Sequence, residues 1–469
     1  MSNTPICDFV KEYARKKPLR FHMPGHKGRK ILGCEPLDLT EIEGADSLFE
    51  ASGIIAESER NASALFGCPT FYSTEGSSLC VRAMLYLAST RGRGKTVLAA
   101  RNVHKSFLYA AALLDFDVRW LYPDDGSYLS NAFSPHSVAA ALDGAEEKPC
   151  CVFLTSPDYL GGVCDVKEIA RVCHERGVLL LVDCAHGAYL RFPAQASVFP
   201  TDLGADLVCS SAHKTLPVLT GGAYLHIGNG VKEEFRPRAK DALALFASTS
   251  PSYLILQSLD AANARLKTLG SKWAPFCLDL FSVSNRLHAA GYGILAPARF
   301  TDGTMTGKTD PEKDLCAADY GKLTVKPKSR GYTGDELAAI LEDRAIYPEF
   351  HDPDHIVFMT SPLNGKKDLK ALERALLSIP CRAPIRESAP PLPRPERVMS
   401  VREALFSPSE RLPASECRGR VLHDPSVSCP PAVPVLMCGE RIDGQAIECF
   451  EYYGVKEVAV VREFGIRNL

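Results

Sequence analysis

The chain has 469 residues, of which 46% are hydrophobic and 23% charged, and its formal net charge is -2 at pH 7. These values are typical of a globular protein with two or three domains, and they exclude a basic nucleic-acid-binding chain and an acidic tail. The N-terminal stretch MSNTPICDFVKEYARKK lacks a signal-peptide core, and no run reaches the roughly 20 apolar residues of a membrane span. We therefore expect a cytoplasmic protein without nucleic-acid or membrane partners.

The 17 cysteines are odd in number, scattered, and often placed inside apolar runs such as Cys150-Cys151 and Cys209. This distribution favours free, buried thiols in a reducing compartment over a disulfide framework. Because no set of His or Cys residues shows close ligand spacing, we expect no metal site.

Residues 1–52 are expected to form an N-terminal arm. The segment Phe21–Gly28, FHMPGHKG, is rich in Gly, Pro and His, which is typical of extended chain. The spacing of His22 and His26 favours ordinary loop histidines over residues that belong to a neighbouring active site.

Regular patterning begins at Gly53. It predicts helices over 54–66, 79–87, 104–114 and 166–176, and strands over 96–100, 118–122, 151–154 and 178–183. Such alternation is typical of an α/β domain with a mostly parallel sheet covered by helices, which we place at residues 53–275. Ligands bind at the carboxyl ends of the strands in such sheets, and Asp183 ends one of them.

The rest of the chain changes character. A helix is expected over 253–266, and residues 276–381 are expected to form a small α+β domain. Its predicted helices cover 276–290 and 335–344, the second with a capping box of Thr333 and Glu336, and its predicted strands cover 322–325 and 356–360. Prolines within 382–397 predict a stiff linker, and residues 398–469 form a C-terminal subdomain that ends in a strand-like GVKEVAVV.

The segment Ala205–Ile227, ADLVCSSAHKTLPVLTGGAYLHI, places Lys214 in a turn between two apolar runs. A lysine anchored in this way can lose its solvent, which makes the neutral amine available for Schiff-base chemistry. A solvated turn lysine is the alternative, because a sequence does not show burial.

Other segments supply complementary chemistry. Gly76-Ser77-Ser78 opens a helical run, where unpaired N–H groups and the helix dipole suit an anion, although a plain serine cap has the same pattern. Together with Lys214, the carboxylate of Asp183 and the ring of His104, this cradle provides the groups that pyridoxal phosphate needs.

Several segments resemble the ornithine, lysine and arginine decarboxylases, a family of aspartate-aminotransferase-like, fold-type-I pyridoxal-phosphate enzymes. They are FHMPGHKG, NVHKS, LLVDCAHGA, SSAHKTLPVLTGGAYLH and CPPAVPVLMCGERI. The resemblance covers most of the chain and is to the shorter, biosynthetic-type members, which lack an N-terminal wing domain. It implies decarboxylation of a basic amino acid to an amine and CO₂ in polyamine biosynthesis, with arginine favoured over lysine and ornithine.

The resemblance also implies roles for single residues. Lys214 would form the Schiff base, Asp183 would pair with the pyridine nitrogen, His104 would stack on the ring, and His186 would lie near it. The phosphate would be held by Gly76, Ser77, Ser78, Ser211 and His213. The family implies a homodimer or higher oligomer with active sites at the interface. Glu349, Asp352 and Glu440 are candidates for binding a cationic side chain.

Some positions depart from the family pattern. Cys184 stands where Glu is usual, Asp158 where Thr is usual, and Gly221 where Gln is common. The terminal segments GRVLHD and PPAVP also depart, which leaves the substrate more open than the cofactor. An aminotransferase or another pyridoxal-phosphate lyase on the same fold, or a catalytically silent homologue that binds the cofactor, remain the alternatives.

Overall fold

The computed structural model describes residues 3–92, 94–193, 197–295, 299–301, 304–306, 319, 321–425 and 433–462. The chain divides into two compact units, one of Met1–Gly92 with Leu179–Lys272 and one of Arg93–Val178 with Trp273–Leu469. Each unit is therefore built from two separate stretches of chain. The domain boundaries predicted after residues 52, 275, 381 and 397 remain predictions.

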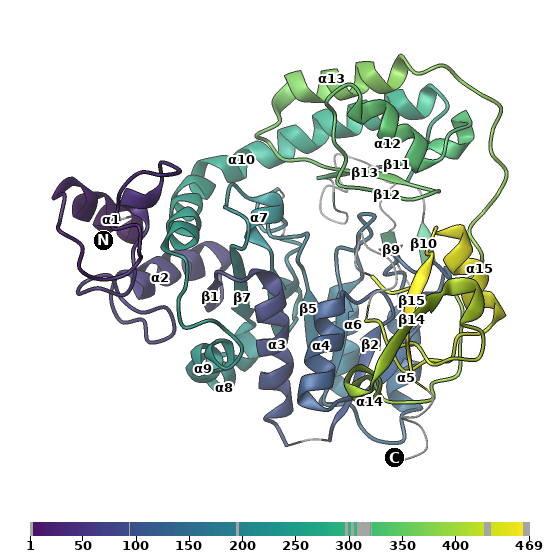
Figure 1. The fold of residues 1–469 in the computed structure, drawn as a ribbon, viewed down its shortest axis with the longest axis horizontal. Helices are drawn as coiled ribbons and strands as arrows, with labels where there is room; N and C mark the ends of the chain where they lie inside the picture. The colour runs from purple at the N-terminus through teal and green to yellow at the C-terminus, as the bar shows by residue number, and fades with distance from the viewer. Residues whose placement is uncertain are drawn as a thin grey trace. The chain divides into compact units, whose positions relative to one another are not determined.

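The first unit holds four strands of the large sheet: β1 (Thr70–Ser73), β5 (Leu179–Asp183), β6 (Leu207–Ser210) and β7 (Ala223–Ile227). Its helices are α1 (Pro5–Arg15), α2 (Ile54–Phe66), α3 (Gly76–Ser89), α7 (Ala212–Thr215), α8 (Lys232–Phe235) and α9 (Ala239–Ala244). The strands follow the order β1-β7-β6-β5, and α3 packs across them (Figure 1). Strands β5 and β6 are parallel, whereas β7 is antiparallel to both β6 and β1.

The second unit holds the other three strands of the large sheet, in the order β4-β2-β3. They are β2 (Thr96–Ala100), β3 (Asp117–Leu121) and β4 (Cys151–Thr155), and both neighbouring pairs are parallel. The helices between and after them are α4 (Lys105–Leu114), α5 (Pro135–Asp143) and α6 (Val166–Glu175). Every residue of β2 and β5 is buried, as expected for parallel strands covered on both faces.

A smaller antiparallel sheet of the second unit has the strand order β12-β13-β11-β8. The strands are β8 (Gly293–Ile294), β11 (Lys322–Lys326), β12 (Phe350–His351) and β13 (Ile356–Met359), and the short strands β9 (Arg299–Thr301) and β10 (Thr304–Thr306) pair with each other. Helices α12 (Gly334–Glu342) and α13 (Gly365–Leu377) accompany them. The predicted capping box is confirmed, because Thr333 and Glu336 bond to each other's backbone N–H groups.

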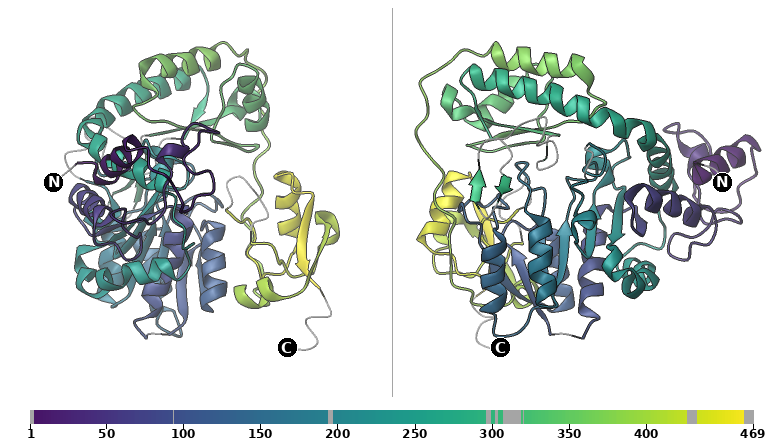
Figure 2. Two further views of the ribbon diagram at one scale, coloured as in Figure 1. Left: turned by 60° about the vertical axis from the view of Figure 1, so that its left-hand side comes forward. Right: turned by 180° about the vertical axis from the view of Figure 1, so that it is seen from behind.

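The terminal piece has its own small core. After residues 381–396, which contain neither helix nor strand, come α14 (Val401–Phe406), β14 (Ser409–Pro413), α15 (Gly444–Tyr452) and β15 (Glu457–Val461). Strands β14 and β15 pair antiparallel, and the ribbon of this terminal piece is yellow in Figure 2. Phe450 of α15 joins Val458 and Val460 in one apolar cluster. Residues 426–432, including Cys429 of the predicted CPPAVPVLMCGERI segment, lie outside the described residues.

The structure differs from the predicted secondary structure in two long helices. Residues Pro5–Arg15 form helix α1, which was not predicted within the N-terminal arm. The helices predicted over 253–266 and 276–290 are one helix, α10 (Tyr253–Ala289), which continues through Pro275. Proline removes one helical hydrogen bond, but a long helix held by its neighbours can absorb that loss.

Two further properties follow from the described residues. Cysteines there are free, and they are buried except for Cys34 and Cys381, in agreement with the expectation of free buried thiols. Among the helices in these ranges, none combines the length and apolar character that crossing a bilayer requires.

Candidate functional site

Lys214 belongs to α7 (labelled in Figure 1). This short helix follows the carboxyl end of β6 on the connection to β7. The structure replaces the predicted turn with one helical turn, α7, because the backbone N–H of Leu216 bonds to Ala212 O. The half-buried Lys214 directs its Nζ to within 2.9 Å of Nε2 of His186, which is buried just after β5. The ends of two parallel strands thus bring a lysine and a histidine together.

Asp183 ends β5 and is buried in the first unit. Its Oδ1 accepts hydrogen bonds from the Ala185 N–H at 3.1 Å and from the Cys209 thiol at 3.2 Å. Burial raises the pKa of Asp183, while the Cys209 thiol, the positive charge of Lys214 and the Ala185 N–H act in the opposite direction. A carboxylate in this position would be stabilised by a cationic partner such as a protonated pyridine nitrogen.

The N-terminus of α3 faces the Lys214 loop. Ser211 donates from its hydroxyl to Ser77 Oγ at 2.9 Å, and Gly76 N–H donates to Gly221 O at 2.7 Å. Gly76 has a φ of +71°, and a Cβ built on it would meet no atom within 4 Å. Open space in front of the first turn of a fourteen-residue helix, next to two serine hydroxyls, suits a phosphate group.

His213 and His104 make local contacts. The His213 side chain bonds through Nδ1 to Gly222 O at 2.9 Å, which holds its ring on the Lys214 loop. His104 belongs to the second unit, where it caps α4 by accepting the Ser106 N–H at Nδ1. The first unit therefore gathers Lys214, Asp183 and His186 together with the serines of the cradle, and His104 is placed in the other unit.

These residues fit pyridoxal phosphate. The group needs a lysine amine, a carboxylate for its pyridine nitrogen and donors for its phosphate. Lys214, the buried Asp183 and the Ser77–Ser211 pair offer these three functions within one unit, with open space at Gly76.

The three carboxylates considered for a cationic side chain already have protein partners. Glu440 is buried and lies 2.7 Å from the Arg101 guanidinium. Asp352 accepts backbone N–H groups from the turn that follows it, and Glu349 accepts the hydroxyl of Tyr159 at 3.0 Å. Glu440 in particular serves as the counter-charge of an arginine, and its role in binding a substrate cation remains a prediction.

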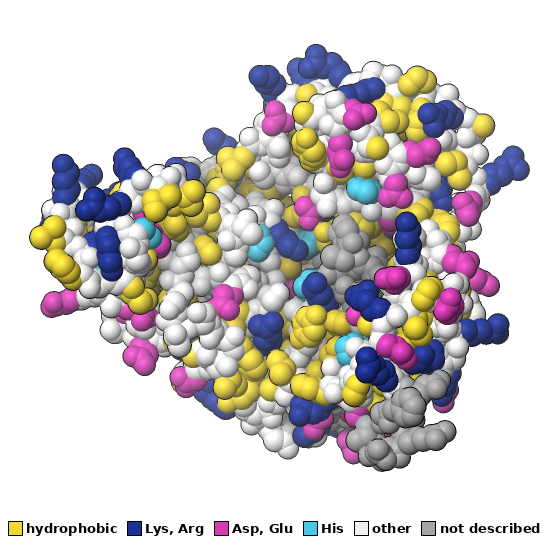
Figure 3. All heavy atoms as spheres, viewed as in Figure 1, with side chains coloured by type: hydrophobic (Ala, Val, Ile, Leu, Met, Phe, Trp, Pro, Cys, Tyr) yellow, Lys and Arg dark blue, Asp and Glu magenta, His cyan; other side chains and the backbone are white. Residues whose placement is uncertain are grey.

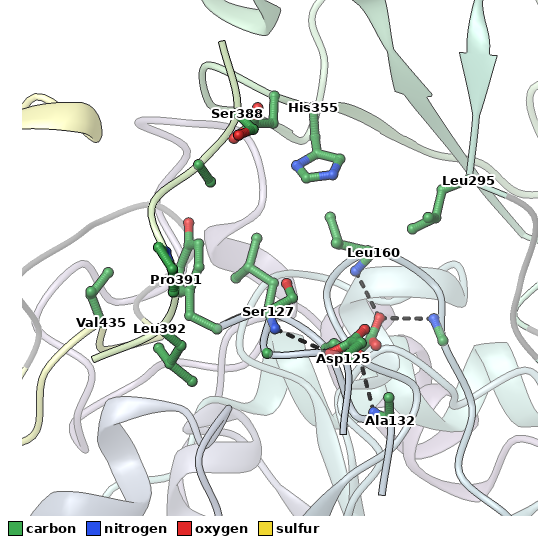
Figure 4. A pocket seen from close by; sticks show the side chains of 18 of the residues that line it. Asp125, Ser127, Ala132, Leu160, Leu295, His355, Ser388, Pro391, Leu392 and Val435 are labelled. Atoms are coloured by element: carbon green, nitrogen blue, oxygen red, sulfur yellow. Dashed lines mark hydrogen bonds between the residues drawn. The ribbon is translucent and has the colours of Figure 1, made fainter. Parts of the chain in front are cut away.

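A cavity of about 560 Å³ lies within the second unit (Figure 4). Leu160, Leu295, Leu392 and Val435 give it apolar walls, and the ring of His355 points into it. None of the nine predicted site residues is among the described residues that line it. This cavity is therefore not the place where the predicted site residues at the ends of the strands lie.

Sequence reasoning missed Cys209 and Arg101 as partners of charged groups. Cys209 reaches Asp183 because β5 and β6 are parallel with these two residues paired in register. Arg101 reaches Glu440 across more than three hundred residues of chain. A purely structural thiol would lie in the same apolar strand pattern as Cys209. No local signal in the sequence could therefore have identified Cys209 as a partner of Asp183.

Known proteins of one family are similar to this chain over most of its length. Residues 4–281 match the family described as Orn/Lys/Arg decarboxylase, major domain. YaaO of Bacillus subtilis (strain 168) is 30% identical over 95% of this chain and 93% of its own length. An arginine decarboxylase of Halalkalibacterium halodurans is 29% identical over 94% of this chain and 91% of its own.

Solved structures show the same fold. Lysine decarboxylase A from Pseudomonas aeruginosa has a TM-score of 0.76 at 19% identity, covering 98% of this chain and 80% of that one. This likeness confirms the predicted fold class, an aspartate-aminotransferase-like α/β large domain. Because the family match spans more than half of the sequence, the chain belongs to the Orn/Lys/Arg decarboxylases, which are pyridoxal-phosphate-dependent amino-acid decarboxylases.

Proposed function

We propose that the chain decarboxylates a basic amino acid, with arginine favoured and lysine or ornithine as alternatives, in polyamine biosynthesis. The bond between the α-carbon and the carboxylate breaks, CO₂ leaves, and the α-carbon takes up one proton to give the amine. Support for arginine comes from the Halalkalibacterium halodurans enzyme, whose similarity to this chain extends over 94% of it.

The observation that carries the proposal is the 2.9 Å approach of Lys214 Nζ to His186 Nε2 beside the buried Asp183. When bound, pyridoxal phosphate supplies a sink for the electron pair left at the α-carbon. Lys214 would hold the cofactor through its amine, and the same amine is placed to return a proton to the α-carbon. His186 exchanges a proton with that amine and orients it.

The remaining residues bind and orient the cofactor. Asp183 would keep the pyridine nitrogen protonated, and Gly76, Ser77, Ser78, Ser211 and His213 would hold the phosphate at the start of α3. His104 would stack on the ring. The active protein is a homodimer or higher oligomer with active sites at the interface, located in the cytoplasm.

The test is an assay of the purified protein with pyridoxal phosphate and, in turn, arginine, lysine and ornithine. The expected result is release of CO₂ and the matching amine, fastest with arginine and without a keto acid. Lys214→Ala is expected to lower turnover by about a thousandfold or more and to abolish borohydride fixation of the cofactor. Exposed Lys232→Ala is the matched control and should retain both.

The other possible results of this assay distinguish the alternative functions. A keto-acid product would identify an aminotransferase, and bound cofactor without turnover of any of the three substrates would identify a silent homologue. Full turnover by the Lys214 variant would contradict the assignment of that lysine.

A further inference from the structure

Cys209 lies on β6 directly beside Asp183 on β5. The two residues are partners in the parallel register, and both are buried. The thiol sulfur is 3.2 Å from Asp183 Oδ1. We propose that Cys209 is a positioning residue, whose thiol donates to Asp183 Oδ1 and so turns Oδ2 toward the pyridine nitrogen of the cofactor; this rests on the proposed function.

The first argument for this role is that the hydrogen bonds of described residues to the Asp183 carboxylate all reach one of its two oxygens. Both donors that reach Asp183 from the described residues, the Ala185 N–H and the Cys209 thiol, go to Oδ1. Oδ2 receives no hydrogen bond from the same part of the chain. One donor lies in the turn after β5 and the other on β6. A carboxylate held at one oxygen by these two donors cannot rotate without breaking both bonds, which leaves the other oxygen at a fixed place for a ligand.

The second argument for this role is that the Cys209 thiol remains protonated. Burial, together with the charge of Asp183 and neighbouring thiols such as Cys80, raises the pKa of Cys209 well above its ordinary value. The sulfur therefore keeps its hydrogen over the whole working range of pH and always acts as a donor. That donation opposes the rise that burial causes in the pKa of Asp183, and so favours the ionised carboxylate that a pyridinium needs.

Local geometry shows why a strand residue performs this task. Cys209 is paired with Asp183 of β5 on one side and with Leu225 of β7 on the other, and the Cys184 N–H bonds to Cys209 O at 2.9 Å. The donor and the acceptor are therefore on a rigid scaffold rather than on a loop, which is the arrangement that holds a binding group most accurately.

The test compares Cys209→Ala, which removes the donor, with Cys209→Ser, which retains one. The apoproteins are titrated with pyridoxal phosphate to obtain the dissociation constant, and the bound form is titrated with acid and base to obtain the pKa of its long-wavelength absorption. We expect the alanine variant to bind the cofactor about threefold to tenfold more weakly with a shifted absorption pKa, since the hydrogen bond from the thiol, a weak donor, to the carboxylate is lost. The dissociation constant of the serine variant for the cofactor should stay within about twofold of that of the unmodified protein.

Two controls, Cys68→Ala and Asp183→Asn, separate the outcomes. Cys68→Ala removes another buried thiol of the same unit and should change neither readout. If Asp183→Asn also leaves both readouts unchanged, the proposed function fails; if Asp183→Asn alters both and Cys209→Ala alters neither, only the role of Cys209 is overturned.

Equal losses in the alanine and serine variants would also overturn the role of Cys209, because volume rather than donation would then matter. Should Cys209→Ala fail to fold, Cys209→Val fills the space without a donor and is read in the same way.

Discussion

His226 lies fully buried in β7 between two hydroxyl groups. Its Nδ1 is 3.0 Å from Thr70 Oγ1, and its Nε2 is 2.8 Å from Ser210 Oγ, one residue before Ser211 of the cradle. Burial lowers the pKa of His226 to about 3. The folded protein therefore holds a neutral imidazole that links β1, β7 and the end of β6.

This burial predicts a pH dependence of stability. An unfolded histidine has a pKa of about 6.5, so the stabilisation is fully present above that pH and is lost as the pH falls from about 6.5 toward 3. His226→Gln removes this dependence. As the pH falls through this range, the free energy of unfolding of the unmodified protein should decrease, relative to that of the variant, by up to about 1.4 kcal/mol per pH unit. Urea midpoints at pH 7, 5.5 and 4.5 measure it.

Exposed His136→Gln is the control for the loss of one imidazole. Parallel curves for the unmodified protein and His226→Gln would mean that His226 does not remain neutral in the fold.

At the level of elements, one buried ion pair joins the end of β2 to the terminal piece. The Arg101 guanidinium lies 5.6 Å from the ring centre of Trp120 and 5.4 Å from that of Tyr122. It contacts Glu440, which also accepts the Met437 N–H at 2.7 Å. Burial raises the pKa of Glu440, and the charge of Arg101 acts against that rise.

Glu440→Gln is therefore expected to destabilise the second unit by about 3–5 kcal/mol, because it leaves a buried guanidinium without its counter-charge. Replacing both partners with apolar residues, as Arg101→Met with Glu440→Leu, should recover much of the loss. Urea unfolding and the rate of proteolysis within 398–462 measure the effect. Asp115→Asn, in the exposed pair with Lys95, is the control and should cause no comparable loss.

The elements also show where prediction from local pattern succeeds. The helix predicted over 54–66 is confirmed residue for residue as α2, and the capping box of α12 is confirmed, because both depend on neighbours within one turn. Helix α1 was not predicted. Its apolar face consists of Ile6, Cys7 and Val10, and so short a pattern can be recognised only when the structure shows that these residues are buried.

On the whole molecule, the N-terminal segment exposes an unusual set of apolar side chains. Leu19, Phe21, Ile31 and Leu32 are 87%, 93%, 78% and 88% exposed, and Figure 3 shows hydrophobic side chains among lysines and arginines on this part of the surface. Exposed apolar patches of this kind mark interaction surfaces. This exposed apolar set supports the proposed homodimer.

Phe21→Asp combined with Leu32→Asp is expected to convert the oligomer to monomers, because burying two carboxylates in an apolar contact is costly. Light scattering after size-exclusion chromatography measures the mass. Leu363→Asp, at a site 65% exposed in the second unit, is the matched control and should remain oligomeric. An unchanged mass for the double variant would contradict the role of this segment.

The sequence by itself determined the alternation of strands and helices, the free cysteines and the residue types of a pyridoxal-phosphate site, because periodicity, capping and motif chemistry act over short stretches of chain. Only the tertiary structure decided that Lys214 meets His186, that Cys209 bonds to Asp183 and that Glu440 is held by Arg101. These contacts depend on strand register and on burial, and both arise from the packing of segments far apart in the chain.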